Sequence, residues 1–227
     1  MSNMSARSHC RCRQVSGAAS ARTTTCSRSN ARWTSSRARR ARTRSNSAKS
    51  MLTKNPRMLA VLDQVAEKSG WGQKLPPRVG RGVCVQPSFA SFIATVVEAE
   101  IDDIGEITLR RITSVVDTGI AVNPDTVKAQ IEGGLIFGLT AALYGEITID
   151  KGRVQQSNFH DYRMMRINET PKIEVIVVKS GEAPGGIGEA GVNAGPPALR
   201  NAIYAATGVA LRRLPIDRKL LAAGKKA

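Results

Sequence analysis

The sequence predicts an α+β fold in which mixed and antiparallel strands pack with a few helices, preceded by a disordered tail rich in Arg and Ser. Two kinds of apolar pattern support this fold class. Some segments alternate apolar and polar residues between turn signals, which is typical of strands. Others repeat apolar residues every three or four positions, which indicates helices of unequal length. Because no strand–helix unit recurs at a fixed period, the pattern favours α+β over a regular parallel α/β fold.

The tail comprises residues 1–48 and carries most of the positive charge. It contains eleven Arg and no Lys, Asp or Glu, whereas the whole 227-residue chain has a net charge of +16. The remaining residues therefore carry only +5. A segment of this composition buries too little apolar surface to offset its loss of chain entropy, so we expect disorder.

Three interpretations of residues 1–48 remain open. The arginines could release phosphate counterions on a nucleic acid, but Trp33 is the only aromatic residue in the segment, so no stacking platform supports RNA binding. The segment could also be a passive arm. The third interpretation is frame-shifted sequence: GC-rich codons for residues 17–21, read one base earlier, give Trp-Arg-Ser-Val-Gly, and ordinary patterned sequence begins abruptly near Lys49.

The first patterned segment, residues 55–69, has apolar residues at helical spacing and ends before Gly70, which predicts an amphipathic helix. A linker rich in Pro, Gly and Arg follows at residues 75–82. Residues 83–101 are then rich in β-branched residues, and the turn at residues 102–106 leads into a strand over residues 107–117. These two segments are expected to form an antiparallel hairpin.

A second helix is predicted after Asn123, which is a typical N-cap residue, with Pro124 in the first helical position. Glycines 133, 134 and 138 weaken this helix intrinsically, so we expect another backbone or a ligand to approach it closely. Apolar residues every fourth position predict that it is largely buried: Val127, Ile131, Leu135, Leu139 and Leu143. A short hairpin near residues 146–155, a strand over 173–178 and a last helix over 197–206, ending at Gly208, complete the domain.

Several classes of protein are excluded or unsupported. No apolar run reaches the roughly 18–20 residues that a membrane span needs, and the first thirty residues lack the apolar core of a secretory signal. The compartment, cytoplasm or periplasm, stays open. Three of the four cysteines lie in the tail, so no disulfide framework or paired zinc site is indicated, and Cys84 reads as a small core residue. His160 beside Asp161 suggests a proton relay only weakly.

The glycine-rich segment over residues 180–191 holds the strongest candidate for chemistry. It contains Gly186-x-Gly188-x-x-Gly191, the nominal dinucleotide-binding pattern. We reject that interpretation because Pro184 interrupts the approach and the helix is expected only from Pro197, whereas the dinucleotide motif opens its helix directly. Glu189 has small neighbours, so its carboxylate could meet a ligand as a general base. Spacing alone equally allows a solvated surface turn.

Four motifs in register resemble a known family. They lie at residues 116–134, 137–139, 155–162 and 186–191. Together they resemble the molybdopterin-binding large subunit of the xanthine dehydrogenase/aldehyde oxidase family, and the closest branch looks like the isoquinoline 1-oxidoreductase beta-subunit type. The resemblance covers about residues 50–217 and matches only the C-terminal part of that subunit. Residues 49–227 therefore resemble the C-terminal portion of such a domain.

The resemblance implies a molybdenum hydroxylase acting on an aldehyde or an N-heterocycle, with water-derived oxygen in the product and hydride passing to molybdenum. By motif match, Glu189 is the catalytic base, although Ala190 stands where the family often has Pro. The residues matched to the cofactor side are Gln130, Gly133, Gly134, Gly186 and Gly188, and no residue is matched as a metal ligand. Packing between helices is an equally good explanation for Gln130, Gly133 and Gly134.

The same resemblance implies a partner and a limit. Members of this branch pair with a small iron–sulfur subunit holding 2Fe-2S clusters, and residues 49–227 contain no cysteine pattern for a cluster. Since a complete site needs further segments, we expect this chain alone to bind no molybdopterin and to be inactive. The alternative function is a basic interaction module that binds polyanions or nucleic acid without catalysis; the sequence makes nucleic acid the weaker partner.

Overall fold

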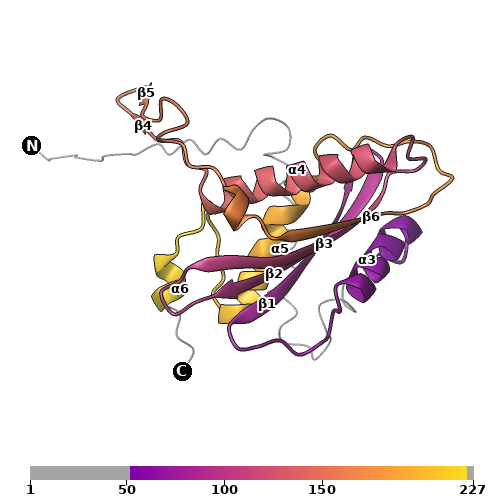
Figure 1. Ribbon diagram of the computed structural model, residues 1–227, viewed down its shortest axis with the longest axis horizontal. Helices are drawn as coiled ribbons and strands as arrows, with labels where there is room; N and C mark the ends of the chain where they lie inside the picture. Colours follow the sequence, from indigo (N-terminus) through magenta and orange to yellow (C-terminus); the bar gives the residue numbers. More distant parts are fainter. Residues whose placement is uncertain (1–51, 224–227) are drawn as a thin grey trace, which may run out of the picture.

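The computed structural model describes residues 52–223 (Figure 1), so the predictions for residues 1–48 lie outside the described part of the chain. Four strands and three longer helices make up the body of the fold. The elements are α3 (Pro56–Lys68), β1 (Val79–Ser88), β2 (Ser91–Ile101), β3 (Ile107–Asp117), α4 (Pro124–Leu143), β4 (Ile149–Asp150), β5 (Arg153–Val154), η1 (Ile167–Glu169), β6 (Lys172–Val177), α5 (Ala190–Thr207) and α6 (Lys219–Ala223).

The main sheet has the strand order β1-β2-β3-β6. Strands β1, β2 and β3 are antiparallel neighbours, whereas β6 lies parallel to β3. Helix α3 contacts one face of the sheet, and α4 and α5 pack together on the other, where α5 contacts β1 and β2. Figure 1 shows α3 and α5 on opposite sides of the strands. The mixed sheet with helices on both faces confirms the predicted α+β class.

Local signals explain the starts of the first two helices. The Asn55 side chain accepts a hydrogen bond from the backbone N–H of Met58, and Asn123 caps α4 in the same way through Asp125 and Thr126. In each helix a proline occupies the first turn, where its missing N–H removes no helical bond. The predicted track along α4, from Val127 to Leu143, is buried and lies in the larger core.

Two boundaries differ from the sequence prediction. Strand β1 begins at Val79, inside the expected linker, and a turn at Phe89 and Ala90 divides the segment that the pattern presented as one strand. Helix α5 begins at Ala190 and not at Pro197, with Pro196 and Pro197 inside it. The prolines misled the sequence interpretation because proline usually ends or kinks a helix, whereas here buried packing on both sides overrides that preference.

An ion pair ties α3 to the end of β3. Arg57 donates two hydrogen bonds of 2.7 Å to the carboxylate of Asp117, and its guanidinium lies 4.7 Å from the centre of the Phe92 ring. The backbone N–H of Gly119 donates to the same carboxylate at 3.0 Å. Because Arg57 hydrogen-bonds the ionised form, the pKa of Asp117 is lowered. The pair thereby fixes the point where the chain leaves the sheet for α4.

Replacing Asp117 by Asn should lower the free energy of unfolding by roughly 1.5–3 kcal/mol at pH 7, because the partly buried Arg57 loses a charge-assisted partner. Because the pKa of Asp117 is lowered in the folded state, the ion pair contributes its full stabilisation at pH values above the unfolded-state pKa of about 3.9. This contribution is lost as the pH falls through the folded-state pKa of Asp117. Urea unfolding of both proteins from pH 7 to 3 should therefore show the difference shrinking below about pH 4. The exposed Asp150 on β4 supplies the control D150N, for which no change is expected. Equal effects of D117N and D150N would contradict this role.

Candidate active site

Helices α4 and α5 touch through their backbones at three glycines. A Cβ on Gly138 would lie 2.5 Å from the carbonyl oxygen of Val192, and one on Gly191 would lie 2.6 Å from that of Ile131. A Cβ on Gly134 would reach 3.2 Å from the Cα of Gly191. The predicted close approach to α4 is therefore made by another backbone at Gly134 and Gly138. It fixes the N-terminal turn of α5 beside the middle of α4.

The glycine-rich loop before α5 is held by three backbone hydrogen bonds to two other segments, the connection after β3 and the β1–β2 turn. The N–H of Ile120 donates to the carbonyl of Glu182 at 2.9 Å, and the N–H of Gly185 donates to that of Thr118 at 2.9 Å. The N–H of Gly186 donates to the carbonyl of Phe89 at 2.7 Å. Side chains at 185 and 186 would collide with the β1–β2 turn, so these glycines allow the loop to lie against it.

Glu189 lies at the junction of this loop and α5. It is the N-cap residue of the helix, is half-buried, and makes no capping hydrogen bond with its side chain. The side chain of Gln130 on α4 donates to the carbonyl of the preceding Gly188 at 2.7 Å. Two residues 58 positions apart, Gln130 and Gly188, are thus in direct contact, and Glu189 is the carboxylate next to them.

The structure brings most of the sequence-predicted site residues together. Gln130 and Gly188 are bonded, Gly134 packs on the start of α5, and Gly186 is docked on the β1–β2 turn. Gly133 differs from its neighbours because it is exposed and a Cβ there would meet nothing within 4 Å. Packing between α4 and α5 therefore does not explain Gly133, and its assignment to cofactor binding stays a prediction.

Strand β1 carries two buried polar side chains, Gln86 and Ser88, that the sequence interpretation missed. Gly80 and Gly82 on β1 sit under α5, since a Cβ on either would come within 2.1 Å of the carbonyl oxygen of Ala202 or Ala198, respectively. Two strand residues thus match four helix residues, as rises of about 3.3 and 1.5 Å per residue require. Gln86 and Ser88 lie further along the same strand, toward its C-terminal end.

Gln86 and Ser88 are 6% and 1% exposed, and their Nε2 and Oγ atoms have no hydrogen-bond partner among the described residues. Unpaired buried polar atoms are uncommon in proteins and call for an explanation. The amide N–H groups of Gln86 and the hydroxyl of Ser88 can donate to a ligand rich in oxygen and nitrogen acceptors. A pterin cofactor has acceptors of this kind, so the residues present fit such a group.

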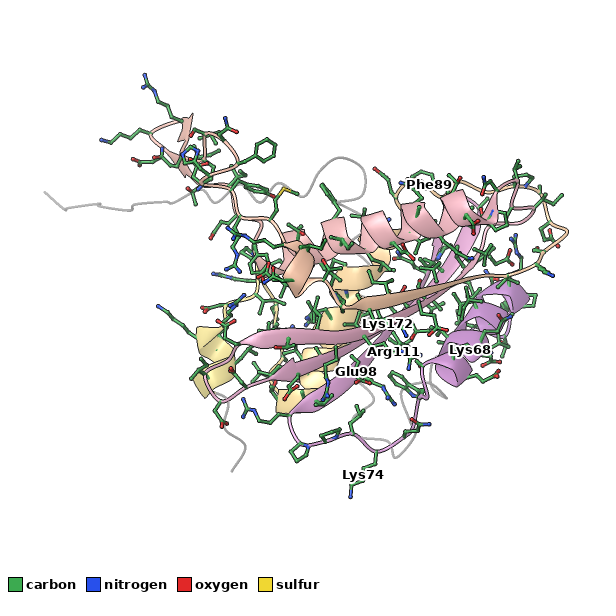
Figure 2. The ribbon with its side chains drawn as sticks, viewed as in Figure 1. Lys68, Lys74, Phe89, Glu98, Arg111 and Lys172 are labelled. Carbon is green, nitrogen blue, oxygen red and sulfur yellow. The ribbon has the colours of Figure 1, made fainter. Side chains whose placement is uncertain are left out.

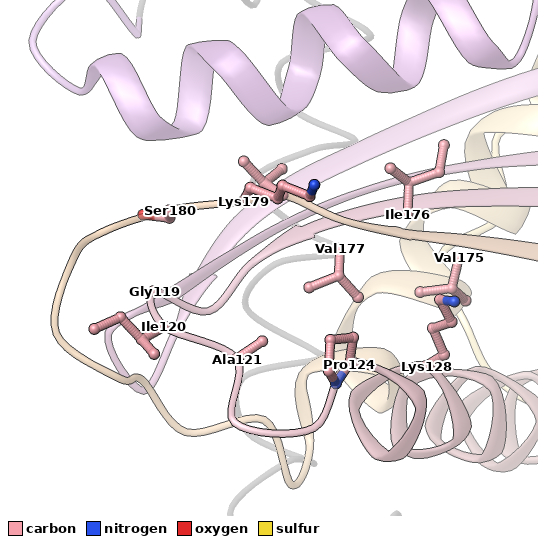
Figure 3. Close-up of a pocket in the computed structure, with 11 residues that line it drawn as sticks. Gly119, Ile120, Ala121, Pro124, Lys128, Val175, Ile176, Val177, Lys179 and Ser180 are labelled. Carbon is pink, nitrogen blue, oxygen red and sulfur yellow. The ribbon is translucent and has the colours of Figure 1, made fainter.

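A pocket of about 520 Å³ lies beside this region, between β6 and the start of α4 (Figure 3). Its lining is mostly apolar, with Lys128 and Lys179 as its basic side chains. The pocket does not include Glu189 or Gln130, so we place the candidate site by the contacts of the glycine loop and not by this concavity. Sequence patterns gave no signal for the pocket, because it forms between segments distant along the chain.

The remaining candidates lie elsewhere or are structural. Asp161 accepts hydrogen bonds from the backbone N–H groups of Asn158 and Ser157, which lower its pKa to about 2, so it closes its own loop. Its neighbour His160 is largely exposed. Cys84 is buried, as predicted. Within residues 52–223 no group of three or more potential metal-ligating side chains is found, and no helix there is long and apolar enough to cross a membrane.

Comparison with known proteins identifies the family. A model of the molybdopterin cofactor-binding domain matches residues 12–171, and the chain therefore belongs to that family. This result confirms the resemblance drawn from the sequence motifs and supports molybdopterin as the cofactor.

The chain is 37% identical over 180 residues to the isoquinoline 1-oxidoreductase subunit beta of Brevundimonas diminuta, an alignment that covers 78% of this chain and 23% of the relative. It is 33% identical over 166 residues to a membrane-bound aldehyde dehydrogenase [pyrroloquinoline-quinone] of Gluconacetobacter polyoxogenes, covering 70% and 22%. Among solved structures, the aldehyde oxidoreductase of Desulfovibrio gigas superposes with a TM-score of 0.52 at 25% identity, covering 59% of this chain and 15% of that one. The chain thus spans less than a quarter of the length of these relatives.

The glycines of α4 give a matched pair of tests. Gly138→Ala should destabilise the chain by about 1–3 kcal/mol, because the new methyl group would overlap the Val192 carbonyl. Gly133→Ala, where space is open, should stabilise it by about 0.5–1 kcal/mol through higher helix propensity. Urea unfolding of the full chain measures both. Similar effects from the two substitutions would contradict the backbone contact between α4 and α5.

Proposed function

We propose that this chain forms the C-terminal part of the cofactor-binding subunit of a molybdenum hydroxylase that oxidises an aldehyde or an N-heteroaromatic compound. The observation that carries the proposal is the placement of Glu189 at the N-terminus of α5, beside the Gln130–Gly188 hydrogen bond. The names of the relatives, an isoquinoline oxidoreductase and aldehyde-oxidising enzymes, support the substrate class. The small share of each relative that the chain covers supports its being one part of a larger subunit.

The residues that would hold the cofactor surround this junction. Gln130 and Gly133 present a polar group and an open backbone on α4, and Gly186 and Gly188 keep the loop free of side chains. Gln86 and Ser88 on β1 carry buried side-chain atoms without a hydrogen-bond partner among the described residues, and these could donate to the cofactor. When bound, the molybdenum cofactor supplies the two-electron redox chemistry.

Glu189 would act as the general base. One oxygen of its carboxylate accepts the proton from the water-derived hydroxyl group whose oxygen enters the product, which makes that oxygen a stronger nucleophile toward the electron-poor carbon. The loop hydrogen bonds and the contact of α5 with α4 hold the carboxylate in place, so little rearrangement accompanies the proton transfer.

The electrons would leave through a partner, proposed as the small iron–sulfur subunit with 2Fe-2S clusters. The described residues offer no cluster of metal-ligating side chains, and Cys84, their only cysteine, is buried in the core. The alternative function, polyanion binding, depends on arginines in residues 1–48, which lie outside the described part of the chain, and no observation on residues 52–223 favours it.

Glu189→Gln in the complete enzyme should lower kcat by about 10²–10⁴-fold while molybdenum and pterin content stay at wild-type levels, because the amide cannot accept the proton. Dye-linked aldehyde oxidation and metal analysis of the same preparation measure the two quantities. Glu182→Gln, an exposed carboxylate of the same loop, is the control and should leave kcat unchanged. Full activity of E189Q would exclude Glu189 as the base.

The 227-residue chain purified from a host that makes the molybdenum cofactor should contain no molybdenum and should show no aldehyde oxidation, because the described residues supply only one wall of the site. The measurements are metal content by mass spectrometry and dye reduction. Stoichiometric molybdenum together with turnover would show that this chain suffices by itself and would refute the proposal that it is one part of the subunit.

A further inference from the structure

The turn between β1 and β2 holds two residues in a backbone conformation that non-glycine residues rarely adopt. Ser88 pairs with Ser91, so the turn has two residues, and Phe89 and Ala90 have φ values of 48° and 63°. Hairpin turns of this kind strongly prefer Asn-Gly, because a Cβ crowds the backbone when φ is positive. A bulky aromatic residue in the first position is therefore strained, and such strain tends to occur where ligands bind.

The surroundings of the turn explain how the strain is maintained. The flanking Ser88 and Ser91 are 1% and 0% exposed, and Ser91 donates a hydrogen bond of 3.1 Å to Thr118. The carbonyl of Phe89 accepts the N–H of Gly186 at 2.7 Å. A Cβ on Gly186 would lie 2.8 Å from the Cβ of Phe89, so the loop and the turn fit together only because residue 186 is a glycine.

The same contacts place Phe89 at the edge of the candidate site. Gly186, whose N–H donates to the Phe89 carbonyl, is three residues before Glu189. The Phe89 side of the turn is not part of the core, because the residue is 45% exposed. Phe89 is labelled in Figure 2. An aromatic side chain thus stands at the surface beside the loop of the proposed catalytic base.

We infer that Phe89 is a specificity-determining residue: its ring provides an apolar wall on which the aromatic ring of a substrate packs while the reacting carbon faces Glu189. The inference rests on the proposed function. Aromatic rings pack favourably against each other in offset or edge-to-face arrangements, whereas a short aliphatic chain gains less from such a wall. The residue thereby favours aromatic aldehydes and N-heteroaromatic compounds over aliphatic aldehydes.

Two variants separate the ring from the strain. Phe89→Leu keeps an apolar side chain without a ring. Phe89→Asn also removes the ring but introduces a residue that tolerates positive φ. The melting temperature of the full chain with this substitution should therefore equal or exceed that of the wild type. Phe159→Leu replaces an aromatic residue that is 84% exposed in the loop after β5 and serves as the control.

The experiment uses the complete enzyme and compares kcat/KM for benzaldehyde and for butanal. Both Phe89 variants should lower the benzaldehyde-to-butanal ratio by about tenfold, mainly through KM for benzaldehyde, whereas Phe159→Leu should leave it unchanged. A ratio that stays within about twofold in both Phe89 variants would overturn the inference while leaving the proposed function intact. A wild-type enzyme that oxidises neither aldehyde nor an N-heteroaromatic compound would overturn both.

Discussion

The backbone contact between α4 and α5 is the constraint on which the candidate site depends. Gly134, Gly138 and Gly191 let the two helices approach more closely than side chains would permit. The Val192 carbonyl that faces Gly138 is also the one whose helical partner position is taken by Pro196, which has no N–H to donate. Since α5 starts at Ala190, this contact also sets the position of Glu189 relative to Gln130.

The loop that precedes Glu189 is also held in place by its own contacts. This loop is hydrogen-bonded to Thr118, which directly follows the end of β3, and to the β1–β2 turn. The end of β3 is in turn held by the ion pair between Arg57 and Asp117. Glycines at 185 and 186 therefore do not make the loop flexible. They allow its backbone to pack directly against the β1–β2 turn. A carboxylate held between a helix contact and a docked loop is well suited to a role that needs a fixed geometry.

Local chemistry explains which parts of the fold could be predicted. The cap at Asn123 and the buried track of α4 follow from residues within one or two turns, and the structure confirms them. The β1–β2 turn could not be predicted, because it lacks the Asn-Gly signal and depends on contacts with a distant loop. The start of α5 was misplaced for a similar reason, since burial outweighed the preference of two prolines. The dinucleotide motif still fails, but because twelve residues separate β6 from α5 where a tight turn is required.

The glycines show most clearly what the sequence could not resolve about the site. Gly133 and Gly134 are adjacent and equally unfavourable in a helix, yet a Cβ on Gly134 would press on α5 and one on Gly133 would meet empty space. Gly188 resembles Gly133 in this respect. A glycine that makes room for the fold's own backbone is explained by the fold. The glycines that leave open surface beside Gln130 and Glu189, Gly133 and Gly188, are not explained by packing among the described residues, and their assignment to cofactor binding therefore stays a prediction.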